Sequence, residues 1–222
     1  MNLEIGEVLM RSVNWLIIGF VVIILAASII YSSLSYNNLS VIVETNGSNT
    51  DVNYNSILSS SLPPVMVNEI KNKALEDVDS ANSTVYTVKV DINSIASKYN
   101  YHANVKIVSQ FGTDQMPMEA TVHGTSMVPT LQDGQEIIVL KTNNLKAGDI
   151  VVAEHPTYGL IVKRLSIIDG TQVYLTSDNK NIDIINNETT LPNGTVKTVT
   201  VQKTPLNTWL PTANVIGVVK VY

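Results

Sequence analysis

The 222-residue sequence has no cysteine, only three histidines and only two phenylalanines. Without cysteine the chain can form no disulfide, no thiol nucleophile and no cysteine-ligated zinc site. The histidines, at positions 102, 123 and 155, do not have the spacing of metal ligands, so we expect neither a metal nor another cofactor. Charged residues are also scarce, at 15% of the chain with a net charge of −5. No basic patch stands out, which argues against nucleic acid as a partner.

Hydrophobic residues are concentrated in one uncharged run, residues 15–31. In helical form this run spans about 25 Å, close to the thickness of the hydrocarbon core of a bilayer. Trp15 and Tyr31 flank it as interfacial anchors do. A cleaved signal peptide would have a basic N-terminal region and a shorter apolar core. We therefore expect an uncleaved transmembrane anchor at residues 13–34, after a short N-terminal segment at residues 1–12.

Few charges bear on the orientation of this anchor. Arg11 and the α-amine precede it, and the first basic residue after it is Lys71. Because positive charge is retained on the cytoplasmic side, this distribution favours a cytoplasmic N-terminus and an extracytoplasmic position for the rest of the chain. The predicted location is the cell membrane, with the lipid bilayer as one partner.

The segment between the anchor and residue 117 divides into two parts. Residues 35–62 are rich in serine and asparagine, and we expect a polar, partly disordered stalk with a short strand at residues 41–43. Residues 63–116 are predicted to be a small α+β segment, in which no pattern of catalytic residues is found.

The α+β segment has three expected elements. A helix follows Pro63-Pro64, and its apolar face consists of Val67, Ile70, Ala74 and Val78. Residues 84–92 are expected to form a strand, because the following residues alternate along it: Tyr86, Val88, Val90 and Ile92. Residues 104–111 are expected to form a second strand.

From residue 117 to residue 222 the sequence alternates between short apolar runs and turn signals such as Asp169-Gly170. Seven strands are predicted in this part of the chain. They occupy residues 119–123, 135–141, 150–154, 160–165, 172–176, 196–203 and 215–221. Short strands separated by such turns form antiparallel sheets, so the predicted fold class is mainly β, with a coiled or barrel-like β domain.

The residues around Ser126 suit a nucleophile. Gly124 and Thr125 precede it, and Met127 and Pro129 follow it closely. A glycine at this place allows a tight turn and the close approach of a substrate strand. Such a turn can expose the serine hydroxyl beside free backbone N–H groups, which is what an oxyanion hole needs. Taken alone, Ser126 fits an ordinary turn serine at least as well.

Lys163 changes this balance, because it lies inside an apolar strand. With a two-residue period it shares a face with Ile161 and Leu165, so its amine is expected in apolar surroundings. Burial disfavours the ammonium form and lowers the pKa of a lysine, which lets the neutral amine act as a base. A neutral Lys163 can take the proton of Ser126, as in the Ser-Lys variant of the catalytic triad. The alternative is a lysine that extends into solvent from an edge strand.

Three more residues are candidates for a place in the site. Asp178 and Asp183 belong to a polar loop at residues 177–183, where they would hold the lysine amine or brace the site. An Asx-rich surface turn is the alternative for both. His123, three residues before Ser126, is a weak candidate for the base, because residues this close along a strand and turn rarely pair as base and nucleophile.

In combination these motifs resemble those of the type I signal peptidases, the membrane enzymes that remove signal peptides during secretion. The segment Gly124-Thr-Ser-Met-Val-Pro-Thr-Leu131 is similar to their nucleophile box. Gly148-Asp-Ile-Val-Val resembles the strand that follows it, and Val162-Lys-Arg164 the box that holds the general base. Ser177-Asp-Asn179 resembles a Gly-Asp-Asn box with serine in place of the glycine.

The resemblance implies that Ser126 is the nucleophile and Lys163 the general base, and two departures bear on the mechanism. Gly124 stands where many bacterial members have a serine that assists the oxyanion hole. The hole here would use the backbone N–H of Ser126 and a group of Thr125. Asp183 stands where bacterial members have a serine, and a carboxylate at that place would favour a charged lysine.

The resulting hypothesis is a membrane-anchored serine endopeptidase, with its catalytic domain in residues 117–222, that removes signal peptides from secretory preproteins after small residues. Three alternatives stay open. The first is a dedicated processing peptidase for a surface protein, with residues 36–115 as its recognition module. The others are a self-cleaving, repressor-like peptidase domain of the same fold and a non-catalytic anchored binding domain. Self-cleaving members cut upstream of their serine, whereas the only Ala-Gly pair here, Ala147-Gly148, lies downstream.

Overall fold

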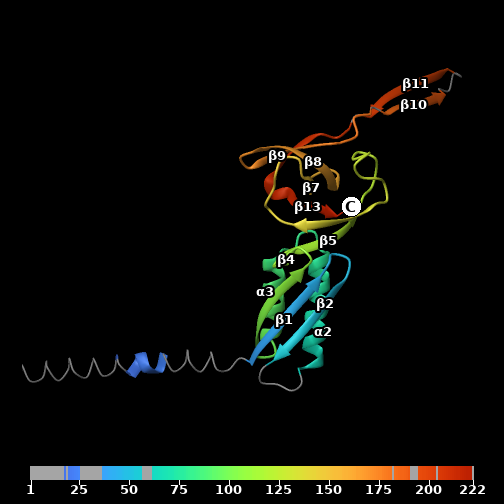
Figure 1. Ribbon diagram of the computed structural model, residues 1–222. Coiled ribbons are helices and arrows are strands. Elements are labelled where there is room, and N and C mark those ends of the chain that lie inside the picture. The colour runs from blue at the N-terminus through green and yellow to red at the C-terminus, as the bar shows by residue number, and fades with distance from the viewer. Residues whose placement is uncertain are drawn as a thin grey trace, which may run out of the picture.

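The computed structural model describes residues 18, 20–25, 37–56, 62–181, 183–190, 195–203 and 205–221. They form an N-terminal unit (residues 37–115), a C-terminal domain (residues 116–221) and a helical stretch at residues 18 and 20–25 (Figure 1). Within these described ranges, no helix has the length and apolar character that a bilayer crossing requires. Most of the predicted anchor at residues 13–34 lies outside the described residues.

The N-terminal unit is a four-stranded sheet with two helices on one face. Its strands have the order β2-β1-β3-β4. The elements are β1 (Asn37–Thr45), β2 (Thr50–Ser56), α2 (Pro64–Asp79), α3 (Val85–Ser97), β3 (Tyr101–Ser109) and β4 (Gly112–Thr113). Strand β1 is antiparallel to β2 and parallel to β3. In the chain, the two helices connect the edge strand β2 to the central strand β3, and β1 lies between these two strands in the sheet.

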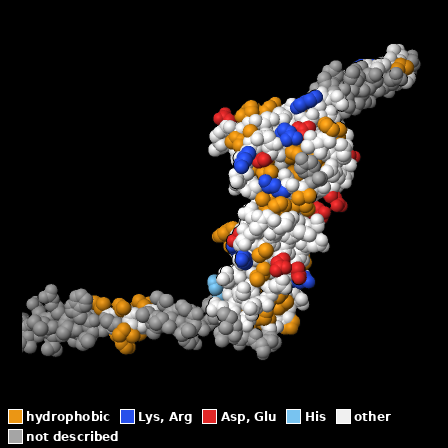
Figure 2. Space-filling view, viewed as in Figure 1, with side chains coloured by type: hydrophobic (Ala, Val, Ile, Leu, Met, Phe, Trp, Pro, Cys, Tyr) orange, Lys and Arg blue, Asp and Glu red, His pale blue; other side chains and the backbone are white. Residues whose placement is uncertain are grey.

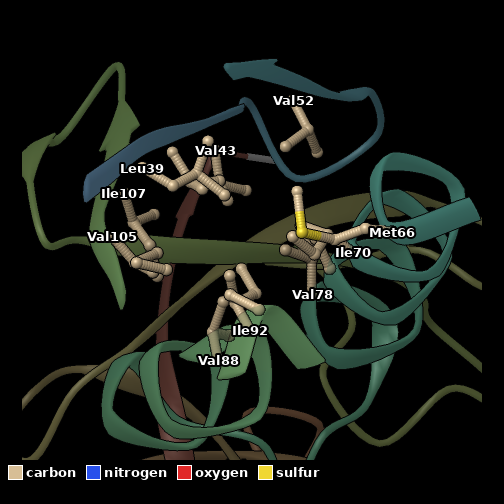
Figure 3. Packing of buried hydrophobic residues seen from close by; sticks show 14 of the residues in the cluster. Leu39, Val43, Val52, Met66, Ile70, Val78, Val88, Ile92, Val105 and Ile107 are labelled. Carbon is tan, nitrogen blue, oxygen red and sulfur yellow. The ribbon is translucent and has the colours of Figure 1, made fainter. Parts of the chain in front are cut away.

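Apolar side chains from the sheet and both helices form one core in this unit (Figure 3). Along β1, Leu39, Val41 and Val43 are buried, and they alternate with more exposed residues. Met66, Ile70, Ala74 and Val78 of α2 are fully buried at helical spacing. The helix therefore packs on the sheet with nearly the face that its sequence predicts, except that Met66 replaces Val67 in the core.

The expected strand at residues 84–92 is wrong, because this segment is helical. Thr84 caps α3, since its hydroxyl oxygen accepts a hydrogen bond from the N–H of Thr87 at 3.2 Å. Val88, Ile92 and Ala96 are fully buried, which is a spacing of four residues. Tyr86, which alternation places on the buried side, is 76% exposed. The two periods share Val88 and Ile92, so the cap is the feature that separates helix from strand.

The predicted stalk at residues 35–62 is wrong for residues 37–56, which form β1 and β2. The short strand expected at residues 41–43 is the middle of β1. Alternating burial in β1 and the pairing of β1 with both β2 and β3 outweigh the low β-propensity of asparagine and serine. The α+β unit therefore begins at β1 and not at residue 63.

The C-terminal domain contains a seven-stranded, fully antiparallel sheet with the order β12-β9-β8-β7-β13-β6-β5. Its strands are β5 (Met116–Thr121), β6 (Glu136–Lys141), β7 (Ile150–His155), β8 (Gly159–Asp169), β9 (Gln172–Thr176), β12 (Thr208–Pro211) and β13 (Val215–Val221). The mainly β fold class is confirmed, and the strands predicted at 172–176 and 215–221 have the observed bounds. The short β12, which the 3-10 helix η1 (Thr212–Asn214) follows directly in the chain, was not predicted.

Both faces of the central strands are buried. Val152 and Val219 belong to one apolar cluster, whereas their neighbours Val151 and Val218 belong to another. Since successive residues of a strand point to opposite faces, the sheet must coil so that each of its ends covers one face. This explains why β7 has four buried residues in succession instead of an alternating pattern.

Two further strands, β10 (Asp183–Thr190) and β11 (Val196–Lys203), form a hairpin that we call the arm. The expected strand at 196–203 coincides with β11, while β10 occupies a segment for which no strand was predicted. The arm projects away from the rest of the described chain (Figure 1). Figure 2 shows basic and acidic side chains interspersed over the N-terminal unit and the C-terminal domain, in places side by side.

The N-terminal unit and the C-terminal domain are packed together directly. Lys141, the last residue of β6, donates hydrogen bonds from Nζ to the carbonyl oxygens of Val78 (2.9 Å) and Ser80 (2.5 Å). A cation at the C-terminal end of α2 is electrostatically favourable. In the β1–β2 turn, Gly47 lies so close to the C-terminal domain that a Cβ there would be 3.2 Å from Ile138. Met116, at the start of β5, is fully buried in the core of the N-terminal unit.

Candidate active site

Ser126 lies in the loop between β5 and β6, which we call the nucleophile loop after the predicted role of this serine. Gly124 has φ +87°, in the left-handed region that favours glycine, and its N–H donates a hydrogen bond to Asp133 Oδ1 at 2.8 Å. After Ser126 the chain turns inward, and Met127 and Leu131 are buried in the core. The loop is therefore held on both sides of Ser126, by a turn contact before it and by core packing after it.

Lys163 points at Ser126 from β8. Its Nζ and the Oγ of Ser126 are hydrogen-bonded at 2.5 Å. As the alternation predicts, Lys163 shares the buried face of β8 with Leu165, and only 4% of its surface is exposed. Burial lowers the pKa of the Lys163 amine below its ordinary value. The structure thus unites the two residues that the sequence singled out, in the geometry that a base and its nucleophile need.

The backbone at Ser126 leaves one donor unused. No residue in the described part of the chain accepts a hydrogen bond from the Ser126 N–H. The carbonyl oxygen of Ser126, in contrast, accepts a hydrogen bond from the N–H of Asn179 at 3.0 Å. A held peptide plane with a free N–H beside the nucleophile is suited to stabilise an oxyanion.

Asn179 holds the nucleophile loop at two points. Besides its backbone contact with Ser126, its side-chain Nδ2 donates a hydrogen bond to the carbonyl oxygen of Thr125 at 3.0 Å. It was not among the predicted site residues, although it is the last residue of the Ser-Asp-Asn motif. Through Asn179, the loop after β9 positions the loop before β6, which is about fifty residues away in sequence.

Asp178 braces the site and does not hold the lysine amine. Its carboxylate accepts hydrogen bonds from Arg164 Nε (2.7 Å) and Nη2 (2.6 Å), and from the hydroxyl of Thr130 (2.5 Å). The Arg164 guanidinium holds the pKa of this carboxyl below its usual range, so it stays ionised. Arg164 lies next to Lys163 in β8 and Thr130 lies four residues after Ser126, so this network connects the strand that carries Lys163 to the loop that carries Ser126.

The other supporting candidates have varied positions. Asp183 is the first residue of β10, where its Cα pairs with that of Lys203, and its side chain lies outside the described part of the structure. Met127 is a core residue. Pro129 is exposed, follows a cis peptide bond and has a carbonyl oxygen that accepts a hydrogen bond from Gln132.

A cavity of about 660 Å³ opens beside the Ser126–Lys163 pair. Segments distant in sequence line it: the nucleophile loop from His123 to Ser126, Tyr158 and Ile161 near the start of β8, and Asn181 and Pro205–Asn207. Its lining contains no carboxylate among the described residues. His123 is therefore near the site, but the contact with Ser126 Oγ comes from Lys163.

The first half of β8 has an open edge next to this cavity. On one side, residues 159–164 of β8 pair with β7. On the other side, pairing with β9 begins only at Arg164. The stretch from Gly159 to Lys163 therefore lacks a strand partner on that side within the described chain, and Ile161 and Lys163 of this stretch line the cavity. An extended polypeptide can pair with such an edge.

Residues 93–197 match the model of the Peptidase S24-like family. The matched segment begins within α3 and ends within β11, so it includes Ser126, Lys163 and Asp178 and leaves out β12 and β13. This superfamily of serine peptidases includes both signal peptidases and self-cleaving repressors. A search of curated proteins finds no match to the chain. The segment around the site is thus a Peptidase S24-like domain.

Proposed function

We propose that this protein is a membrane-anchored serine endopeptidase of the signal-peptidase type. The observation that carries the proposal is the 2.5 Å contact between Lys163 Nζ and Ser126 Oγ at a buried lysine. The Peptidase S24-like match supports serine peptidase chemistry at the same residues. Secretory preproteins are the proposed substrates, cut after small residues as the resemblance to signal peptidases implies.

In the proposed reaction, the neutral amine of Lys163 accepts the hydroxyl proton of Ser126 while Oγ attacks the scissile carbonyl carbon. The free N–H of Ser126 donates a hydrogen bond to the oxyanion that forms. Lys163, now an ammonium, gives its proton to the departing amine as the C–N bond breaks. A water molecule then attacks the acyl-enzyme, with Lys163 again as the base, and Ser126 is regenerated.

The substrate is proposed to bind in extended form. The open edge of β8 offers backbone groups to a substrate strand, and the cavity beside Ser126 receives the side chains next to the scissile bond. Backbone pairing gives affinity without regard to sequence, so it suits an enzyme that processes many precursors. Selection for small residues would then depend on the space beside Ser126.

The membrane location is proposed from the uncharged run and from its described part. Within the described part of the structure, the apolar side chains at residues 18 and 20–25 are between 48% and 66% exposed. Exposed apolar surface of this kind is suited to lipid contact. The distribution of positive charge favours an extracytoplasmic catalytic domain.

The N-terminal unit favours a second candidate, a processing peptidase dedicated to one surface protein. A folded α+β unit that packs on β5 and β6 can bind a partner, whereas a disordered stalk offers no defined surface. In that case the unit selects the substrate and the catalytic steps are unchanged.

The test is cleavage of a membrane-inserted preprotein by the purified full-length protein, with Ser126→Ala as the control. We expect a cut after a small residue that is lost in Ser126→Ala, because that variant has no nucleophile. Cleavage of one surface-protein precursor and of no generic preprotein would favour the dedicated peptidase. Cleavage that persists in Ser126→Ala would refute the assignment of the nucleophile.

The pH dependence of cleavage reports on Lys163. Because the neutral amine is the active form, activity is present above the lowered pKa of Lys163 and is lost as the pH falls through it. We therefore expect kcat/KM to rise with pH, with a midpoint below 10.5, the ordinary pKa of a lysine. The measurement is kcat/KM for a soluble peptide across the pH range in which the fold is intact by circular dichroism. A midpoint near 10.5 would contradict a buried, neutral base.

A further inference from the structure

We propose that the bound substrate pairs with one edge of the β10–β11 arm as a third strand. The arm thereby binds the substrate residues that flank the scissile bond. This inference rests on the proposed peptidase function and specifies how a long substrate is held. The ligand is an extended polypeptide, recognised mainly through its backbone.

Both ends of the arm emerge at the rim of the catalytic cavity. Asn181 precedes β10 and Pro205–Asn207 follow β11, and all of these residues line the cavity beside Ser126. A substrate that leaves the cavity past this rim therefore meets the arm first.

The base of the arm is fastened to the site. Ser177 is fully buried; its N–H donates a hydrogen bond to Asn207 Oδ1, and its hydroxyl donates one to the carbonyl oxygen of Leu206, both at 2.9 Å. On the other stem, the N–H of Asn181 donates to Asn179 Oδ1 at 2.9 Å. Since Asn179 also holds the nucleophile loop, the direction of the arm is coupled to the position of Ser126.

The arm has two strand edges that no other strand of the described chain covers. In the described chain β10 and β11 pair only with each other, in one continuous register from Asp183↔Lys203 to Thr190↔Val196. Natural proteins usually protect an edge by charged side chains, above all lysine, by proline, by a bulge or by a short strand. These two strands carry four charged residues, Asp183, Glu188, Lys197 and Lys203, but each strand has eight residues and no proline, and their register has no bulge. Such an edge is a template for another extended chain.

The composition of the arm and its lack of further strand partners in the described chain also favour the addition of a third strand. β11 reads Val-Lys-Thr-Val-Thr-Val-Gln-Lys, rich in the β-branched residues that favour strands. An isolated two-stranded hairpin is only marginally stable in water, and a third strand stabilises it. An eight-residue strand extends about 26 Å, so the arm can pair with roughly eight substrate residues beyond the cavity.

The experiment removes the arm and leaves its stems in place. Because Asp183 and Lys203 are paired, residues 184–202 can be replaced by an Asn-Gly turn that joins them directly. The variant retains Asn181 and the residues of the second stem. The short substrate is a nine-residue peptide with alanine at the first and third positions before the cut. Two extended peptides carry eight further residues, one at the N-terminal end and the other at the C-terminal end.

For the wild type we expect kcat/KM to be about tenfold higher for one of the extended peptides than for the short one, since several backbone hydrogen bonds are added. The armless variant should lose this advantage and cleave the short peptide as well as the wild type does. N-methylation at alternate positions of the extension should abolish the advantage in one register and preserve it in the other, because only every second N–H faces a paired strand.

Two results would overturn the arm proposal: equal cleavage of the extended peptides by both proteins, or an equal loss on short and extended peptides. The peptidase assignment is tested separately by the same set. If the wild type cleaves no peptide, binding of the labelled extended peptides to Ser126→Ala protein, with and without the arm, still decides the role of the arm. Weaker binding without the arm supports it, and unchanged binding refutes it.

Discussion

Replacing Lys163 by methionine is expected to lower kcat by about a thousandfold or more, because the reaction then has no base for the Ser126 proton. Methionine has a similar length and an apolar side chain, so it suits a position that is only 4% exposed. The variant should therefore fold normally and should be at least as stable as the wild type. The measurement is kcat for a peptide substrate, together with the thermal unfolding midpoint.

The matched control for this variant is Lys141→Met. Burial lowers the pKa of Lys141 as well, to about 8, but its amine contacts backbone carbonyls at the end of α2. We expect Lys141→Met to reduce stability by loosening the contact between the two units and to leave kcat nearly unchanged. If Lys163→Met retained more than a tenth of the wild-type kcat, Lys163 would not be the base.

Replacing Gly217 by alanine is expected to destabilise the protein by about 3 kcal/mol or more, which corresponds to a decrease in Tm of about 6–12 °C. Gly217 lies in β13, the strand between β7 and β6. A Cβ at this position would be 2.2 Å from the carbonyl oxygen of Leu140 and 2.9 Å from Cα of Lys141. Both are backbone atoms of the neighbouring strand, so the sheet itself must shift.

Gly170→Ala is the control, because its loss of stability comes from the backbone conformation and not from a steric clash. Gly170 has φ +57° in the β8–β9 turn, and no atom lies within 4 Å of a Cβ built there. We expect a loss of about 1 kcal/mol, the usual cost of a left-handed conformation for a residue with a side chain. Thermal unfolding followed by circular dichroism measures both variants. Equal unfolding midpoints for Gly217→Ala and Gly170→Ala would contradict the prediction, because they would show that β13 and β6 move apart at little cost in stability.

Local sequence was a good guide where one period dominated the pattern. β9 and β13 were predicted with the observed bounds, because turn residues interrupt the chain on both sides of an apolar run. In α3 the apolar residues fit two periods, and the helix is distinguished by its Thr84 cap. The composition of β1 predicts part of a stalk, because serine and asparagine mask the alternation of Leu39, Val41 and Val43.

The sequence by itself determined which two residues are the candidates for a nucleophile and its base. Alternation within β8 places Lys163 on the buried face, and the glycine before Ser126 marks the exposed turn, so both residues follow from rules that act within a few positions. Their catalytic roles stay predictions, as do the anchor and the substrates.

Only the tertiary structure decided which groups surround the pair. Asp178 was a candidate partner of the lysine amine, yet it binds Arg164 and Thr130. Asn179 clamps the nucleophile loop, and both stems of the arm reach the rim of the cavity. These contacts join residues far apart in the chain, and a polar side chain takes whichever partner the fold brings near. Local patterns carry no information on that choice, because it depends on how the sheet coils and which loops meet at its end.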